Sequence, residues 1–414
     1  MKILALNSGS SSVKYELYDC EKKKTISKGT VERIGIDGSF INYSIHDEKI
    51  KENFICNNQI AAVNKIITII SDKNNRLLND IEDLRAVSHR ITHGGSFYHN
   101  SVFINDEVYN NIESLTKFAP LHIPHNLSGI KAVKEFLPNL PQIAVFDTAF
   151  HQTMPEHAYR YSIAKKWYEQ HGIRRFGYHG TSHLYVSRRA AVVMNKKHTD
   201  TNLITLHIGN GASAAAIKNG KSIDTSLGFG TLDGIIMGTR PGALDPTIPL
   251  YMMEEKNLSI SDTYNELYKN SGVLGITGKY TDRRDVMDAA NKGDKDSKLA
   301  LDMEAYYLKK HIGMYLAVLG RVDAIVFTAG VGENSPYARK TALEGLENLG
   351  IILDHDINEK TTSSSGETLI STKDSKIKVY MIPTNEELIF IEDAIGLLEG
   401  TYTNTNDYIY SFQK

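Results

Sequence analysis

Two turns rich in glycine, serine and asparagine, half a chain apart, carry the residue types best suited to hold a phosphate. They lie in residues 4–15, LALNSGSSSVKY, and 205–216, TLHIGNGASAAA. In each, one apolar strand-like run enters the turn and another leaves it, so backbone N–H groups and hydroxyls are free to bind phosphate. The candidates are Asn7, Ser10, Ser12 and Lys14 in the first turn and His207, Gly209, Asn210 and Gly211 in the second. One such hairpin alone could equally be a tight Ser/Gly turn beside a solvated lysine. Two of them predict related halves that bind one nucleotide across a cleft.

A third glycine-rich segment follows the apolar run that ends near residue 328. It contains Gly330, Gly332 and Asn334 and precedes a predicted helix. Close backbone approach and a helix N-terminus favour a bound phosphate or ribose at this point. An ordinary turn between a strand and a helix is the structural alternative.

Two arginines stand beside turn residues at the ends of apolar runs, Arg90 in SHRITHGG and Arg240 in MGTRPGALDP. A planar guanidinium is suited to clamp a carboxylate or a phosphoryl group in transfer. Asp147 ends the run IAVFD, where open α/β sheets bind their ligands. It could hold Mg²⁺ through water or position an acceptor oxygen. Either Glu386 or Glu387, in PTNEEL, could also serve a metal, but the pair could simply be first-turn glutamates favoured by the helix dipole.

Histidines recur in pairs, yet their Gly- and Pro-rich surroundings and the absence of an H-E-x-x-H pattern argue against zinc. His179, in GYHGTSH, is the exception that we single out for chemistry, because flanking glycines expose it in a turn. A histidine there could donate to the equatorial oxygens of a phosphoryl group.

Composition narrows the class of protein. The chain has 414 residues, 41% of them hydrophobic, and a formal charge of -2. It is long enough for two domains and gives no sign of a nucleic-acid or membrane partner. Cys20 and Cys56 have no metal or redox spacing, and the short apolar start is not a signal peptide. A cytoplasmic protein is the expectation.

The order of elements predicts an α/β protein with mixed sheets. Strand-like runs reach residue 47 as a β-meander; a helix follows over 59–71, and strands and helices then alternate to residue 150. The pattern restarts at 151, with a long helix over 297–320 and a strand after it. A Gly turn then leads to a helix that we expect to begin after Ser335 and to end at Gly350. The predicted domains are 1–150, completed by 386–414, and 151–385.

Taken together, these segments resemble the acetate kinase family of the actin, sugar kinase and heat-shock ATPase superfamily. The resemblance runs through almost the whole chain in ten ordered motifs. They are NSGSSSVK, HRITHGG, APLHIPHN, FDTAFH, RRFGYHGTSH, HIGNGAS, MGTRPGALDP, TDRRD, FTAGVGENS and PTNEEL. It implies two duplicated ribonuclease H-like domains, MgATP in the cleft (with Mn²⁺ as an alternative metal), a homodimer, and reversible phosphoryl transfer between ATP and a small carboxylate.

The resemblance also assigns roles. It implies that Arg90 and Arg240 hold the carboxylate and the phosphoryl group, that His179 stabilises transition-state charge, and that His122 is a secondary contact. Asp147 and Glu386 would position Mg²⁺ directly or through water, with Asn7 near the metal and phosphates. The adenosine would be surrounded by Asp282, Arg284, Gly330 and Val331.

The implied acyl pocket departs from the family pattern of valine, leucine, phenylalanine and proline. The corresponding residues here are Thr92, Leu121, Tyr178 and Thr231. Threonine is nearly the size of valine and tyrosine is larger than phenylalanine, so the pocket is no larger than usual, which favours acetate over butyrate. On the other hand, a hydroxyl that faces the methyl group of acetate without a hydrogen-bond partner is energetically costly. Either these hydroxyls bond to the protein or the natural acid is small and polar.

Three other functions stay open from the sequence. One is a propionate or other short-chain acyl kinase, which carries out the same reaction on another acid. Another is an actin- or chaperone-like ATPase, in which paired arginines would have no carboxylate to clamp. The third is a pyrophosphate-using relative, although the intact GVGENS and TDRRD segments favour ATP.

Overall fold

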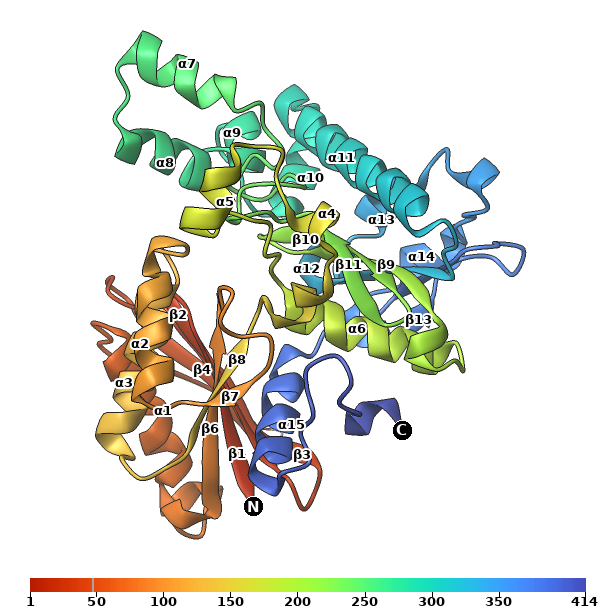
Figure 1. Ribbon diagram of the computed structural model, residues 1–414. Coiled ribbons are helices and arrows are strands. Elements are labelled where there is room, and N and C mark those ends of the chain that lie inside the picture. Colours follow the sequence, from red (N-terminus) through yellow and green to blue (C-terminus); the bar gives the residue numbers. More distant parts are fainter. Residues whose placement is uncertain (47) are drawn as a thin grey trace. The chain divides into compact units, whose positions relative to one another are not determined.

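The computed structural model describes residues 1–46 and 48–414. The chain divides into two compact units, one of Met1–Ala149 with Asn385–Ser411 and one of Phe150–Thr384 with Phe412–Lys414. Each unit is built on one mixed β-sheet flanked by helices (Figure 1). The predicted α/β class with two mixed sheets is confirmed.

Unit 1 holds an eight-stranded sheet in the order β5-β4-β3-β2-β1-β6-β8-β7. Its strands are β1 (Lys2–Ser8), β2 (Ser12–Asp19), β3 (Lys24–Glu32), β4 (Phe40–Ile45), β5 (Glu48–Asn53), β6 (Leu84–Ile91), β7 (Val102–Phe103) and β8 (Gln142–Phe146). Its helices are α1 (Gln59–Ser71), α2 (Asp106–Ser114), α3 (Ile123–Phe136) and α15 (Glu386–Glu399). β1 pairs antiparallel with β2 but parallel with β6, and β6 pairs parallel with β8.

The central strands of this sheet are covered on both faces. Ile3 to Leu6 of β1 are all buried, as a strand with helices on both sides requires. Figure 1 shows α1 and α3 against one face and α15, drawn in blue, against the other. The apolar spacing of α1 supplies much of this core, and Asn58 caps the helix by accepting from the Ala61 N–H.

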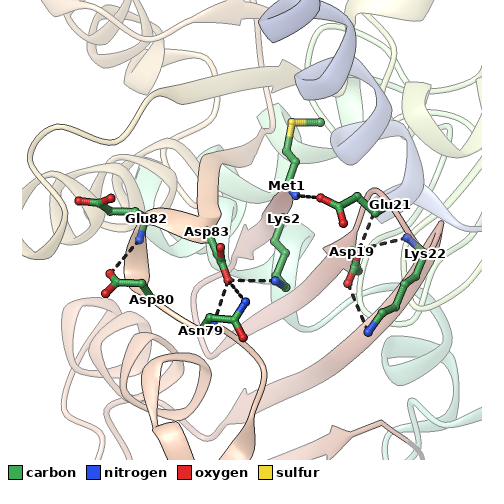
Figure 2. Close-up of polar contacts among 9 residues, drawn as sticks. All are labelled: Met1, Lys2, Asp19, Glu21, Lys22, Asn79, Asp80, Glu82 and Asp83. Carbon is green, nitrogen blue, oxygen red and sulfur yellow. Dashed lines mark hydrogen bonds and ion pairs between the residues drawn. The ribbon is translucent and has the colours of Figure 1, made fainter.

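The amino end of β1 is fixed by charged contacts, shown in Figure 2. The Met1 amino group lies 2.8 Å from Glu21 Oε1, and Lys2 Nζ lies 3.2 Å from Asp83 Oδ2. Asp19 Oδ1 accepts the backbone N–H groups of Glu21 and Lys22. These contacts lie at the amino end of β1, and Asn7 lies near its other end.

Unit 2 holds a six-stranded sheet in the order β11-β10-β9-β12-β14-β13. Its strands are β9 (Asn202–Ile208), β10 (Ala212–Lys218), β11 (Lys221–Thr225), β12 (Ala324–Thr328), β13 (Thr368–Leu369) and β14 (Lys378–Met381). Its longer helices are α6 (Gly180–Val193), α7 (Thr247–Lys256), α8 (Ile260–Lys269), α10 (Arg283–Asn291), α11 (Lys295–Leu319) and α13 (Pro336–Leu343). The shorter ones are α4 (Glu156–Tyr159), α5 (Lys165–His171), α9 (Gly272–Thr277), α12 (Ala329–Asn334) and α14 (His355–Lys360).

The two sheets repeat one topology. β9 pairs antiparallel with β10 and parallel with β12, and β12 pairs parallel with β14. This is the arrangement of β2, β1, β6 and β8 in unit 1. The turns after β1 and β9 are the two candidate phosphate-binding turns. These two turns therefore occupy equivalent places in the two sheets.

Three local expectations need correction. A fifth meander strand, β5, follows residue 47, where the sequence analysis expected none. The expected Gly turn at 330–334 is the helix α12. Ser335 caps α13 as expected, but α13 ends at Leu343, and Gly350 instead follows a 3₁₀ turn over Glu347–Leu349.

No helix in residues 1–46 and 48–414 is both long enough and apolar enough to cross a membrane.

Candidate active site

Parallel pairing brings three candidates of unit 1 to one edge of its sheet. Asn7, Arg90 and Asp147 lie at or just past the carboxyl ends of β1, β6 and β8. The Asp147 N–H donates to the carbonyl of Ile91, which extends the β6–β8 pairing by one residue. Arg90 Nη2 then donates to Asp147 Oδ2 at 2.8 Å. Ligand sites form at such an edge because loops leave the strands there.

Arg90 keeps its charge although its side chain is half-buried. Burial alone would lower its pKa, but the charges of Asp147 and Glu386 raise it above the ordinary value. Its Nε is buried without a hydrogen-bond partner among residues 1–46 and 48–414. The side chain is 21% exposed, so a guanidinium fixed by an ion pair is still accessible to an anionic oxygen.

The turn after β1 is rigid at its base and open at its tip. Gly9 N–H donates to the Ser12 carbonyl at 2.8 Å, and Gln59 Nε2 donates to the carbonyls of Gly9 and Ser10. Ser10 and Lys14 are exposed. The backbone is held in place while the side chains that could meet a phosphate remain accessible.

Glu386 opens helix α15, which packs against β1 and β6. Asn385 caps the helix by accepting the Leu388 N–H at 3.1 Å. Glu386 and Glu387 are therefore first-turn glutamates of a capped helix, which is the structural alternative to metal binding. Burial raises the pKa of the neighbouring Glu387, and the charge of Glu386 adds to that shift.

The acyl-pocket candidates of unit 1 come from β6 and the start of α3. The Thr92 hydroxyl lies 3.2 Å from Asn126 Oδ1, which also accepts the Thr92 N–H at 3.0 Å. Leu121 and His122 are half-buried, and His122 stands at the N-cap of α3. The hydroxyl of Thr92 therefore has a protein partner.

In unit 2, His179 is held in an unusual backbone conformation. It sits at the N-cap of α6 with φ 56°, in the left-handed region that few non-glycine residues adopt. Its Nδ1 lies 2.8 Å from Ser213 Oγ, and its ring stacks on that of His207 with centroids 4.1 Å apart. His207 Nδ1 in turn lies 2.8 Å from Ser182 Oγ. These contacts fix the ring of His179 from two sides.

Arg240 and His179 converge on Gly211. A Cβ at Gly211 would lie 2.7 Å from Arg240 Nη2 and 3.4 Å from His179 Nε2. Arg240 Nη1 donates to the Thr231 carbonyl at 2.9 Å. Burial lowers the pKa of Arg240, although the guanidinium stays charged. One cation and one ring nitrogen thus meet at a turn where only glycine leaves room.

The remaining turn residues of unit 2 are packed closely. The Gly209 N–H donates to the Gly211 carbonyl, and the Gly238 N–H donates to the Asn210 carbonyl. A Cβ at Gly238 would lie 1.8 Å from Asn210 Oδ1 and 3.3 Å from Arg283 Nη1. The turn after β9 therefore adjoins the start of α10.

Tyr178, the pocket candidate of unit 2, is buried, and its hydroxyl donates to the Phe229 carbonyl at 2.9 Å. Thr231 is half-buried and contributes its carbonyl to Arg240. The backbone partner of Tyr178 satisfies the hydroxyl that distinguishes it from phenylalanine.

The adenosine candidates fall on two helix starts. Asp282 caps α10 and pairs with the exposed Arg284, which lowers the pKa of Asp282 to about 2. Gly330, Val331, Gly332 and Asn334 all belong to α12. A Cβ at Gly209 would lie 3.9 Å from the Ala329 Cβ, so α12 starts beside the turn after β9.

The sequence analysis did not single out the groups that hold these parts. Glu333 Oε1 accepts the N–H groups of Ala329, at 2.8 Å, and Thr384, at 3.0 Å, and so fixes the start of α12, where Ala329 has φ 64°. The buried Arg339 donates to the carbonyls of Gly332 and Glu333. No spacing rule marks a carboxylate or an arginine that bonds to backbone.

His183 is another residue that the sequence analysis did not single out. It is fully buried and lies one turn after His179 on α6. Its two ring nitrogens contact Thr205 Oγ1 and Ser213 Oγ. The spacing of one helical turn between His183 and His179 is the sequence signal that could have identified it.

Within the described residues, 1–46 and 48–414, no group of three or more His, Cys, Asp and Glu side chains is arranged to hold a metal ion.

Comparison with known proteins agrees with this architecture. The Acetokinase family model matches residues 2–392. The chain is 52% identical to the acetate kinase of Geobacter metallireducens, with 100% of this chain and 99% of that protein covered, and 51% identical to that of Geobacter sulfurreducens with the same coverage. The crystal structure of Porphyromonas gingivalis acetate kinase matches with a TM-score of 0.89 and 42% identity, covering 96% of this chain and 99% of that one. A propionate kinase from Francisella tularensis matches with a TM-score of 0.88 and 38% identity, covering 95% and 98%. These neighbours confirm the fold expected from the ten motifs, and the chain belongs to the acetokinase family.

Proposed function

We propose that the chain catalyses reversible phosphoryl transfer between ATP and acetate, giving ADP and acetyl phosphate. The observation that carries this proposal is the convergence of Arg240 Nη2 and His179 Nε2 on Gly211. Two fixed donors at a glycine turn are what a phosphoryl group with growing charge requires. Membership of the family indicates the reaction class, and Arg240 and His179 are the groups that would stabilise the transferred phosphoryl group.

The acceptor carboxylate needs no general base because it is already a nucleophile. In the proposed mechanism the partly exposed guanidinium of Arg90 binds the carboxylate, while Arg240 and His179 donate to the phosphoryl group in transit. Asp147 orients Arg90 through their 2.8 Å ion pair. Catalysis then consists of in-line alignment and charge stabilisation.

The nucleotide roles follow the same logic. We assign the phosphates to the two equivalent turns, with Asn7, Ser10, Ser12 and Lys14 in unit 1 and His207, Gly209, Asn210 and Gly211 in unit 2. We assign the adenosine to the starts of α10 and α12, with Asp282, Arg284, Gly330, Val331, Gly332 and Asn334.

Mg²⁺ is the metal that we propose, held by Asn7 and Glu386, with Asp147 acting through water. The donor set fits because amide and carboxylate oxygens suit a hard cation. Asp147 and Glu386 are also near each other, since the charges of both raise the pKa of Arg90. Bound there, the ion would neutralise phosphate charge. Mn²⁺ accepts the same oxygen ligands and is the alternative.

Acetate is the acid that the pocket residues favour. The hydroxyls of Thr92 and Tyr178 are both bonded within the protein, so neither demands a polar substrate. Propionate is the second candidate, supported by the likeness to a propionate kinase structure. Acetate should outperform propionate and butyrate, and a preference for glycolate would overturn this choice.

A homodimer and a cytoplasmic location complete the proposal. Three helices of unit 2, α7, α8 and α11, carry exposed apolar side chains that a second copy of this chain would cover: Ile248, Leu250, Tyr251, Ile260, Tyr306, Met314 and Val318. Cys20 and Cys56 are free thiols, which suits a reducing compartment. Light scattering on the eluting protein tests the dimer, and cell fractionation tests the location.

The decisive experiment measures ADP release from MgATP with a panel of acids and traps acyl phosphate as the hydroxamate. Strong turnover that depends on acetate supports the proposal. ATP hydrolysis at a rate that does not change when acids are added would instead indicate an actin- or chaperone-like ATPase and would refute the proposed activity. His179→Ala, Arg90→Ala and Arg240→Ala should each lower kcat far more than they change the KM for acetate.

A further inference from the structure

We propose that a chain of buried hydrogen bonds, Thr205–His183–Ser213, fixes the tautomer of His179 so that its proton sits on Nε2. The inference rests on the proposed role of His179 as a donor to the phosphoryl group. Thr205, His183 and Ser213 are positioning residues, because they act through His179.

The contacts form one continuous path inside unit 2. Thr205 Oγ1 lies 2.6 Å from His183 Nδ1, and His183 Nε2 lies 2.8 Å from Ser213 Oγ. Ser213 Oγ also lies 2.8 Å from His179 Nδ1. The side chains of Thr205, His183 and Ser213 are fully buried, so water does not interrupt the path.

The path allows only two proton arrangements. Burial, with the nearby His151 and His207, holds the pKa of His183 well below its ordinary value, so this ring is neutral and has one N–H. Ser213 has one hydroxyl proton and can donate to only one of its two histidine neighbours. The donors therefore run either from Thr205 towards His179 or from His179 towards Thr205.

Thr205 decides the direction. In residues 1–46 and 48–414, the partner of its hydroxyl is His183 Nδ1. If His183 donated to it, the buried hydroxyl proton of Thr205 would have no acceptor, which costs about 1–3 kcal/mol. If Thr205 donates instead, every group in the path is satisfied. Then His183 Nε2–H donates to Ser213, and Ser213 donates to His179 Nδ1.

This direction of donation determines the protonation of His179 Nε2, the ring nitrogen nearest to Gly211. With Nδ1 occupied as an acceptor, the proton of neutral His179 sits on Nε2, the atom 3.4 Å from the Cβ position of Gly211. That nitrogen can donate to a phosphoryl oxygen without first gaining a proton. In the opposite arrangement, neutral His179 would present a lone pair there and repel the same oxygen.

The chain offers a matched pair of variants. Thr205→Val keeps the shape but removes the hydroxyl, and Thr205→Ser keeps the hydroxyl. In protein labelled with ¹⁵N-histidine, long-range ¹H–¹⁵N spectra distinguish a protonated from an unprotonated ring nitrogen, and His179→Gln identifies the signals of His179.

We expect the wild type to show His179 protonated on Nε2. Thr205→Val should mix the two tautomers and lower kcat about 2- to 10-fold with an unchanged KM for acetate, and Thr205→Ser should restore both. Ser213→Ala removes the donor to Nδ1 and should lower kcat about 10- to 100-fold.

A wild-type spectrum with the proton on Nδ1 overturns the inference, even if His179→Gln abolishes turnover. So does a Thr205→Val protein with unchanged spectrum and unchanged kcat. Normal turnover of His179→Gln would instead refute the proposed role of His179, whatever the spectra show. The two failures are therefore distinguishable.

Discussion

The glycine at position 211 gives a sharp test of the proposed site, because a side chain there would meet Arg240 and His179. Gly211→Ala would place a methyl group 2.7 Å from Arg240 Nη2, well inside contact distance. The neighbouring ring atoms of His179 lie at 3.4 and 3.5 Å and need little adjustment. The far end of the arginine therefore has to move.

The size of the effect follows from that displacement. To reach ordinary contact the guanidinium must shift by about 1 Å, and misplacement of a catalytic group by 1 Å can cost about 10²-fold in rate. We expect kcat to fall about 10- to 100-fold, equivalent to about 1.4–2.7 kcal/mol of transition-state stabilisation. The fold should survive, because the obstructing atom ends a flexible side chain and Arg240 Nη1 can keep its bond to the Thr231 carbonyl.

The assay compares acetate-dependent acyl phosphate formation and thermal unfolding in parallel. Arg240→Lys and the Gly211→Ala/Arg240→Lys double variant complete a cycle. If Gly211→Ala acts through the guanidinium, its effect on kcat should shrink greatly in the Arg240→Lys background. Additive losses, or a Gly211→Ala protein with normal kcat, would refute the reasoning, and a large fall in Tm would show that the glycine serves the fold instead.

Three further predictions concern stability and are checked by denaturant unfolding. Burial raises the pKa of Asp393 from 3.8 to about 7, so between those values the folded protein holds a proton that the unfolded chain has released. The free energy of unfolding should therefore fall by up to about 4 kcal/mol as the pH rises through this window, and Asp393→Asn should remove most of that slope. Arg283→Met strands the buried Glu304 and should cost about 3–5 kcal/mol, whereas adding Glu304→Leu should recover much of the loss; equal stability of both variants would contradict this. Arg339→Met removes five hydrogen bonds to buried acceptors and should destabilise unit 2 by more than about 3 kcal/mol, and a smaller loss would mean that water replaces the arginine.

Periodic segments could be predicted from the sequence because their signals are local. The helix over 59–71 has a clear apolar spacing and a capping asparagine, and the structure places α1 over Gln59–Ser71. The strand β5 was missed because its sequence, EKIKEN, is almost entirely charged or polar. Such a composition is what an exposed edge strand uses to avoid pairing with other chains.

The start of α12 shows why other details could not be predicted. Glycines suggested an open turn, but the segment is helical because Glu333 accepts the Ala329 N–H and also the N–H of Thr384. The second contact comes from 51 residues away along the chain. Local propensity carries no information about such a partner. The same is true of the Thr205–His183–Ser213 path, whose members come from two strands and a helix.

The repeated topology places two turns with different proposed roles at equivalent positions of the two sheets. In unit 1 the cross-strand pair at the turn is Asn7 opposite Lys14, and Lys14 is exposed. In unit 2 the pair that flanks the equivalent turn is His207 opposite Ser213, and both are buried. An exposed lysine on a flexible stem suits attraction of a charged nucleotide, because it can follow the phosphates as they move. A buried pair has fixed geometry, which suits donors that must already be aligned when charge develops. The difference lies in burial at matching positions of the two sheets, so on the proposed assignment we expect that exchanging a single side chain between the turns would not exchange their roles.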